Sequence, residues 1–164
     1  MLRKLFNRLG STLYVQIWSS HIKVTDVRSG QVFDEAPLVA IKTTGTNKRV
    51  VAIGNQAQQC AVHDTVVTNP FLHPRVLFAD FVVGEELLKH IIHALSAKRL
   101  IVPAPLVVIH AMEKTEGGLT YIERRAFMEL AEGAGARRAY VYEGPELPIA
   151  GFEAAFLATQ PTTA

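Results

Sequence analysis

The sequence predicts an α/β fold with a mixed sheet, and three observations lead to this fold class. Leu106–Ile109 is an uninterrupted aliphatic run, as in strands that are covered on both faces. Thr120–Glu123 has the capping-box pattern, which predicts the start of a helix that ends at Gly133 and Gly135. Ala139–Tyr142 is the next apolar run. A strand-helix-strand unit of this length favours right-handed parallel pairing.

The first third of the chain has strand-like segments in which apolar and polar residues alternate. Such alternation between short polar turns predicts an antiparallel meander. We expect its strands at Leu13–Ile17, Ile22–Val27, Gln31–Phe33, Leu38–Ile41 and Val50–Ile53. A short helix is expected at Asn55–Ala61. Two prolines and the lack of a clear period predict an ordered loop at Val62–Pro74.

Three helices follow from the later pattern. Glu85 and Glu86 suit the first turn of a helix, where the dipole favours negative charge, and Lys98 and Arg99 suit its end. Its predicted buried stripe is Leu87, Leu88, Ile91, Ile92 and Leu95. On the helix that starts at Thr120, the predicted apolar side is Ile122, Ala126, Phe127 and Leu130. Pro148 suits the first turn of a last helix, before a polar tail.

Composition limits the class of protein. A chain of 164 residues that is 49% hydrophobic can bury a core without a metal or a disulfide. Its net charge of +2 gives no basic face for nucleic acid. Cys60 is the single cysteine, which fits a reducing cytoplasm. The sequence has neither a secretory signal nor the ~18 consecutive apolar residues of a membrane span.

Residues 1–10 form a short cationic amphipathic segment. Apolar and basic residues alternate at helical spacing, and they are Leu2, Leu5, Phe6 and Leu9 with Arg3, Lys4 and Arg8. One interpretation is a membrane-surface anchor with its cations near anionic lipid. The other is a first helix packed on the domain. Because isolated helices below ~12 residues are marginal, membrane binding would need several copies on one assembly.

Catalytic and metal-binding patterns are weak in this sequence. His90 and His93 stand three residues apart on a predicted helix, but no third ligand is near, so a polar helix face is the favoured interpretation. His110 follows a core strand at the edge where α/β folds bind ligands, although such a histidine is more often structural. The common phosphate loops and the nucleophile elbow are missing. The sequence therefore predicts no catalytic residue, no metal ligand and no cofactor.

Several collinear segments give a more specific signal, because their spacing resembles the N-terminal subdomain of the MreB family throughout. These segments are Met1–Phe6, Asp34–Ile41, Ala79–Phe81, Ile122–Ala126, Ala131–Arg137 and Glu143–Pro145. MreB proteins are bacterial actin-like proteins that determine rod shape. The resemblance implies an actin-like, ribonuclease-H-like fold for residues 11–158, with a flexible tail at 159–164. It also favours the membrane-anchor interpretation of residues 1–10.

The same resemblance implies that the nucleotide site is degenerate. The family has a D-x-G-T-x-N turn that cradles ATP phosphates and organises magnesium, whereas this sequence has Gln16, Trp18, Ser19 and His21 at those positions. An indole at Trp18 would obstruct a phosphate that approaches the backbone, and Gln16 lacks the charge that hydrated Mg²⁺ favours. The family's catalytic glutamate corresponds to Gly144. The sequence also stops where the second half of an actin-like cleft would begin.

Three functions are compatible with this pattern. The first is a non-catalytic module for cell shape that binds MreB-type filaments or itself, in the cytoplasm or at the inner face of the membrane. The second is an ATPase subunit whose cleft is completed by another chain. The third is a truncated product without a selected role, against which the intact apolar core strands argue.

Overall fold

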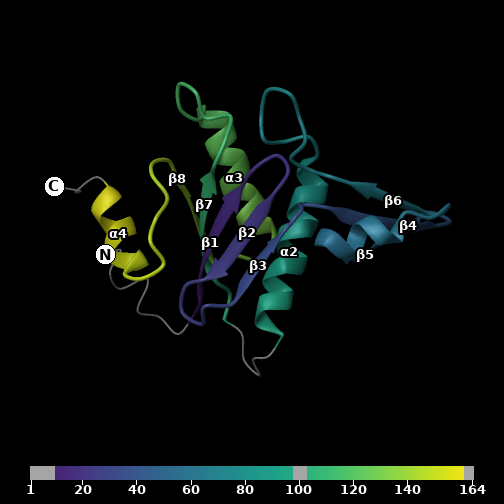
Figure 1. Cartoon of the computed structure of the whole chain (residues 1–164), viewed down its shortest axis with the longest axis horizontal. Coiled ribbons are helices and arrows are strands. Elements are labelled where there is room, and N and C mark those ends of the chain that lie inside the picture. Colours follow the sequence, from purple (N-terminus) through teal and green to yellow (C-terminus); the bar gives the residue numbers. More distant parts are fainter. Residues whose placement is uncertain (1–9, 98–102, 161–164) are drawn as a thin grey trace.

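The strands form two sheets in the computed structural model, which describes residues 10–97 and 103–160 (Figure 1). The larger sheet has the order β3-β2-β1-β7-β8. Its strands are β1 Thr12–Ile17, β2 Ile22–Asp26, β3 Val32–Glu35, β7 Leu106–Ala111 and β8 Arg138–Tyr142. The first three strands pair antiparallel, whereas β1, β7 and β8 run parallel. The predicted mixed sheet is therefore confirmed.

The smaller sheet has the order β5-β4-β6, and it extends away from the larger one at the right of Figure 1. Its strands are β4 Val39–Thr44, β5 Asn47–Ile53 and β6 Thr65–Thr68. The predicted antiparallel meander is divided between the two sheets, because the chain leaves the first sheet around Pro37, which cannot donate to a strand ladder. The loop expected at Val62–Pro74 contains β6, whose β-branched residues pair with β4. The short helix before it is a 3₁₀ helix, η1 Gly54–Cys60.

Side chains alternate across the larger sheet and divide the core into two layers. Leu13, Val15 and Ile17 of β1 pack on the face covered by α2 (Phe81–Ser96) and α3 (Tyr121–Gly133). Tyr14 faces the other side, where it packs with Phe152 and Phe156 of α4 (Phe152–Thr159). The larger sheet lies between α4 on one side and α2 and α3 on the other, as Figure 1 shows. Burial on both faces explains why β1 and β7 carry so few exposed polar residues.

Two of the three helices begin at residues other than those predicted. The Asp80 carboxylate accepts a hydrogen bond from the Val83 N–H at 3.1 Å, so α2 starts at Phe81 and Glu85 lies in its second turn. Helix α4 starts after Gly151, whose φ is 74°, rather than at Pro148. The buried stripe of α2 is confirmed, with Leu87, Leu88, Ile91, Ile92 and Leu95 all in the core.

The apolar side of α3 is partly confirmed. Phe127 and Leu130 are buried, whereas Ile122 is 78% exposed, so its predicted burial is wrong. The first turn of α3 projects past the strand ends in Figure 1, and Ile122 belongs to this turn. At the other end, the Gly135 N–H donates to the Glu132 carbonyl at 3.0 Å, and φ is +104° at Gly135. This arrangement confirms the glycine-containing end of the helix.

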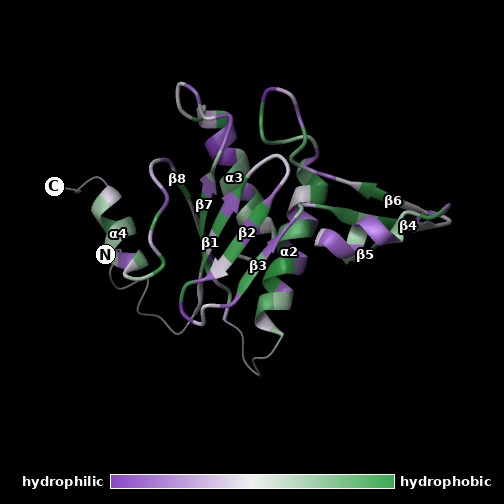
Figure 2. Cartoon of the chain, in the orientation of Figure 1, coloured by the Kyte–Doolittle hydropathy of each residue, from purple (hydrophilic) through white to green (hydrophobic). Residues whose placement is uncertain are grey.

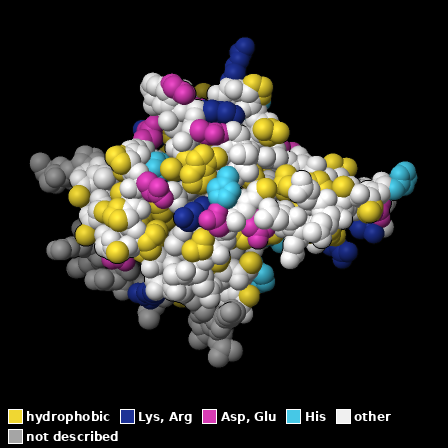
Figure 3. Space-filling view, viewed as in Figure 1, with side chains coloured by type: hydrophobic (Ala, Val, Ile, Leu, Met, Phe, Trp, Pro, Cys, Tyr) yellow, Lys and Arg dark blue, Asp and Glu magenta, His cyan; other side chains and the backbone are white. Residues whose placement is uncertain are grey.

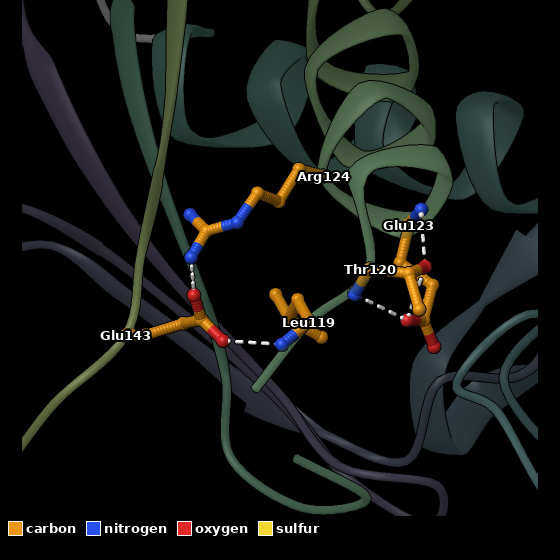
Figure 4. Close-up of polar contacts among 5 residues, drawn as sticks. All are labelled: Leu119, Thr120, Glu123, Arg124 and Glu143. Atoms are coloured by element: carbon orange, nitrogen blue, oxygen red, sulfur yellow. Dashed lines mark hydrogen bonds and ion pairs between the residues drawn. The ribbon is translucent and has the colours of Figure 1, made fainter. Parts of the chain in front are cut away.

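The capping box at the start of α3 is present in both directions (Figure 4). The Thr120 hydroxyl accepts from the Glu123 N–H at 3.2 Å, and the Glu123 carboxylate accepts from the Thr120 N–H at 2.8 Å. We expect Thr120→Ala to lower the free energy of unfolding by about 1 kcal/mol, because it leaves a helix N–H without its acceptor. Urea denaturation measures this change. Glu129→Ala on the exposed face of α3 is the control, with a change within about 0.5 kcal/mol; equal effects of the two variants would contradict the prediction.

Some predicted features lie outside the described residues. They are the amphipathic segment apart from Gly10, the basic end of α2 at Lys98 and Arg99, and tail residues 161–164. Within the described ranges, no helix is both long and apolar enough to cross a membrane.

Candidate functional site

The residues with predicted functional roles converge at the carboxyl ends of the parallel strands, at the upper edge of the sheet in Figure 1. The parallel register of β1 and β7 sets Gln16 beside His110. The turn at Trp18–His21 follows β1, and the segment from Glu143 to Leu147 follows β8. Parallel α/β sheets bind ligands at this kind of edge, so this is the candidate site.

The turn between β1 and β2 is held by contacts within the chain. The Trp18 N–H donates to the His21 carbonyl at 2.9 Å, which closes the turn. The Ser19 N–H donates to Oε1 of Glu113 at 2.5 Å, and the Ser19 carbonyl accepts from Nδ2 of Asn69 at 2.7 Å. The Glu113 carboxylate, in the loop after β7, therefore occupies the Ser19 N–H, which could otherwise donate to a bound anion.

The aromatic side chains of the same turn are also engaged. The ring centroids of Trp18 and His21 lie 5.3 Å apart, and Nε2 of His21 is 2.5 Å from Oδ1 of Asp34 on β3. Trp18 is partly buried, so its indole occupies space directly beside the turn. The turn thus has both a bulky side chain and a neighbouring carboxylate where a phosphate would have to approach.

Gln16 is 1% exposed, and its amide is satisfied by another carboxylate. Its Nε2 donates to Oε1 of Glu146 at 2.9 Å. Burial of an amide without a partner would cost a few kcal/mol, so this bond matters for the stability of β1. A glutamine is suited to this contact because it donates, whereas an ionised aspartate would repel Glu146.

His110 belongs to a buried network rather than to an open site. Burial lowers the pKa of His110, although a hydrogen bond with the Gly144 backbone acts in the opposite direction. Nδ1 of the neutral ring lies 2.6 Å from the Tyr14 hydroxyl, which also accepts from the Leu147 N–H at 3.3 Å. Burial raises the pKa of Tyr14 to about 12, so the hydroxyl keeps its proton and donates to His110. This supports the structural interpretation of His110.

Glu143 and Gly144 shape the remaining part of the site. The Glu143 carboxylate accepts from the Leu119 N–H at 2.5 Å and forms an ion pair with Arg124, so it ties β8 to the start of α3 (Figure 4). Gly144 has φ +151°, and a Cβ at this position would lie 2.5 Å from the Tyr142 hydroxyl. A small hollow of about 140 Å³ lies beside them, lined also by His110, Met112 and Thr115.

The structure sets Gln16 beside His110, which is hydrogen-bonded to the Gly144 backbone. Trp18, Ser19 and His21 lie in the turn after β1, where their contacts are to Glu113, Asn69 and Asp34. Sequence reasoning missed Glu113 and Glu146, which provide the carboxylates of the site. Both stand in irregular segments without a motif, and no sequence spacing signals that they face β1. His90 of α2 lies 3.8 Å from Glu86, away from this edge. Within residues 10–97 and 103–160, no group of three His, Cys, Asp or Glu residues could hold a metal ion.

The fold and the position of this turn define an actin-like domain. A crystal structure of MreB5 of Spiroplasma citri bound to ADP is similar to it, with a TM-score of 0.62 and 22% identity over 82% of this chain and 38% of that one. A double helical filament of MamK is also similar, with a TM-score of 0.57 and 19% identity over 79% of this chain and 40% of that one. Both likenesses concern the fold.

The particular family follows from the sequence comparisons. The family model for MreB/Mbl proteins matches residues 13–160, and the chain belongs to this family. The cell shape-determining protein MreB of Escherichia coli K12 is 30% identical over 149 residues, which cover 88% of this chain and 42% of that protein. Mbl of Bacillus subtilis 168 is 26% identical over 140 residues, which cover 84% of this chain and 39% of that protein. The chain thus spans less than half the length of these relatives.

Proposed function

We propose that this chain is a non-catalytic member of the MreB/Mbl family, which does not bind or hydrolyse ATP and acts through association with filaments of its relatives or with itself. We place it in the cytoplasm, at the inner face of the membrane when its N-terminal segment binds lipid. Relatedness to cell-shape proteins supports this role. The single observation that carries the loss of nucleotide binding is the occupied turn after β1, where the Glu113 carboxylate accepts from the Ser19 N–H and the Trp18 indole packs on His21.

The electrostatics of the site support this proposal. Glu113 and Glu146 each bond to a donor at the carboxyl end of β1 or in the turn that follows it. A triphosphate entering there would face two carboxylates instead of free donors, and like charges at such distances repel. The backbone donor of Ser19 and the side-chain donor of Gln16 are thus both used within the chain.

A calorimetric titration tests the proposal. We expect no saturable heat when ATP with Mg²⁺, or ADP with Mg²⁺, is added at millimolar concentration to the purified chain. Glu113→Ala frees the Ser19 N–H and is expected to remain silent, because Trp18 and Gln16 still prevent phosphate and magnesium from binding. A full-length MreB under the same conditions is the positive control. Saturable, magnesium-dependent binding by the parent chain would overturn the proposal.

An alternative function is an ATPase subunit whose cleft another chain completes. The hollow of about 140 Å³ beside His110 and Gly144 favours it, because it opens at the strand ends, and MreB5 has been solved with ADP. Photolabelling with azido-ATP in a mixture with full-length MreB separates the two functions. The alternative requires label on the 18.0 kDa chain, and our proposal expects label on MreB alone.

Association with filaments is tested by co-sedimentation. We expect the chain to pellet with polymerised MreB from the same host and to remain in the supernatant without it. The reason is the fold that this chain shares with MamK, which has been solved as a double helical filament. Sedimentation of the chain alone at the same concentration would instead indicate self-association. If the chain stays in the supernatant under both conditions, this part of the proposal is wrong.

A further inference from the structure

A groove of about 980 Å³ lies between α4 and the amino end of β1, at the end of the sheet opposite to the candidate site. Its lining includes Gly10, Thr12, Val27, Ile149, Leu157 and Ala158. Ile149 is exposed, and Leu157 is half-buried. Hydrophobic side chains gather in this part of the surface in Figure 3, where α4 lies in Figure 1. The groove is thus separate from the candidate site, because none of the residues that line it belongs to that site.

Helix α4 is apolar on two sides, which is unusual for a helix at the surface. Phe152 and Phe156 are buried against Tyr14 and Tyr142 of the sheet. Ala154, Leu157 and Ala158 line the groove, and Leu157 also packs on the core. Green covers most of α4 in Figure 2. Apart from Glu153, the groove side of α4 is therefore apolar, and a second apolar helix face could cover it.

We propose that the groove is the intramolecular docking site of the N-terminal segment, residues 1–9, when this segment is not bound to lipid. The segment joins the domain at Gly10, which itself lines the groove. A helix of its nine residues would be about 13 Å long, and the eight residues of α4 span about 12 Å, so the two match in length. Leu2, Leu5 and Phe6 supply an apolar face that would cover the groove side of α4.

Charge determines the direction in which the segment lies. The lining includes one carboxylate, Glu153 at the start of α4, and one cation, Arg28 after β2. The segment has Arg3, Lys4 and Arg8 and no acidic residue. Its cations are therefore expected on the Glu153 side of the groove and away from Arg28. The same apolar face cannot contact lipid and α4 simultaneously, so docking competes with membrane binding.

Paramagnetic relaxation measured by NMR tests the docking directly. A spin label is attached through Asn7→Cys, on the polar side of the segment, in a Cys60→Ser background. We expect the amide signals of Ala154, Leu157 and Ala158 to lose most of their intensity, whereas Val66 of β6 keeps its intensity. Leu5→Glu with Phe6→Glu should restore the α4 signals. Arg3→Gln is the matched control, because it keeps the apolar face and should retain the loss.

Three results would overturn the inference. The first is full intensity for α4 in the labelled chain, and the second is loss centred on another surface. The third is an equal loss of signal in ¹⁵N protein without a spin label, mixed with spin-labelled ¹⁴N protein, which would mean that a second copy fills the groove.

Ala158→Lys on the exposed side of α4 should abolish the loss of the α4 signals without unfolding the domain.

A lipid measurement separates this inference from the proposed membrane role. Vesicles of phosphatidylcholine with phosphatidylglycerol are expected to bind Ala158→Lys several-fold more tightly than the parent chain, because the segment is released. If neither chain binds vesicles while the α4 signals are still lost, docking stands and the membrane part of the proposed function fails. If both bind equally, docking does not compete with lipid and the inference is overturned.

Discussion

Phe127→Ala is expected to lower the free energy of unfolding by about 3 to 5 kcal/mol. The Phe127 side chain is 1% exposed and lies in the core between α3 and the sheet. Its ring centroid is 4.5 Å from that of Phe78, in the segment before α2. Truncation leaves a cavity where three elements meet, and tight packing prevents the neighbours from filling it. Urea denaturation monitored by circular dichroism measures the change.

Ile122→Ala is the matched control for this prediction, since it lies on the same helix. Ile122 is 78% exposed, so we expect its removal to change the free energy of unfolding by no more than about 0.5 kcal/mol. The two variants compare the burial that α3 actually has with the burial that helical spacing predicts. Similar losses for both would mean that the orientation of α3 on the sheet is wrong.

Gly144→Glu is expected to destabilise the protein by about 2 to 4 kcal/mol and to leave it without ATP hydrolysis. This φ of +151° is rarely adopted by other residues, which costs about 1 to 3 kcal/mol. The new Cβ would also meet the Tyr142 hydroxyl, which donates to the Pro145 carbonyl at 2.8 Å. Loss of that bond adds about 1 kcal/mol. Denaturation and a phosphate-release assay provide the two readouts.

Gly30→Ala separates the cost of the backbone conformation from the cost of the contact with the Tyr142 hydroxyl. Gly30 has φ +72°, but a Cβ added at this position would have no other atom within 4 Å, so its substitution tests backbone conformation alone. We expect a loss of about 1 kcal/mol, clearly below that of Gly144→Glu. ATP hydrolysis by Gly144→Glu would mean that the chain binds ATP, which would contradict the proposed loss of nucleotide binding. Stability equal to that of the parent chain would contradict the conformation at Gly144.

These results would show how closely the structure around Gly144 depends on glycine at this position. Gly144 now follows β8 in a conformation that suits glycine, and its backbone forms a hydrogen bond with His110. His110 in turn accepts from Tyr14, which receives the Leu147 N–H. The segment after β8 is therefore held by a network that links three parts of the chain. A glutamate at position 144 would disturb this network, and we therefore do not expect it to position a water molecule.

Periodicity predicted the elements whose burial depends on their own sequence. The aliphatic runs of β1 and β7, the capping box at Thr120 and the buried stripe of α2 were all recognisable, because each pattern is local. The interpretation of the turn at Gln16–His21 as degenerate came from the family resemblance and stays a prediction. The family resemblance then supplied the order of the elements, and the comparisons confirm it.

Tertiary structure decided what no local pattern contains. β6 was missed because its short run becomes a strand once β4 offers an edge, and the burial of Ile122 depended on where the sheet ends. Glu113 and Glu146 are distant from Ser19 and Gln16 in sequence, and only the parallel register of β1 and β7 brings them to the same edge. The sequence by itself determined which residue types stand in the turn after β1, because residue types are local. The fold determined which side chains occupy the site, because such contacts depend on the packing of the whole domain.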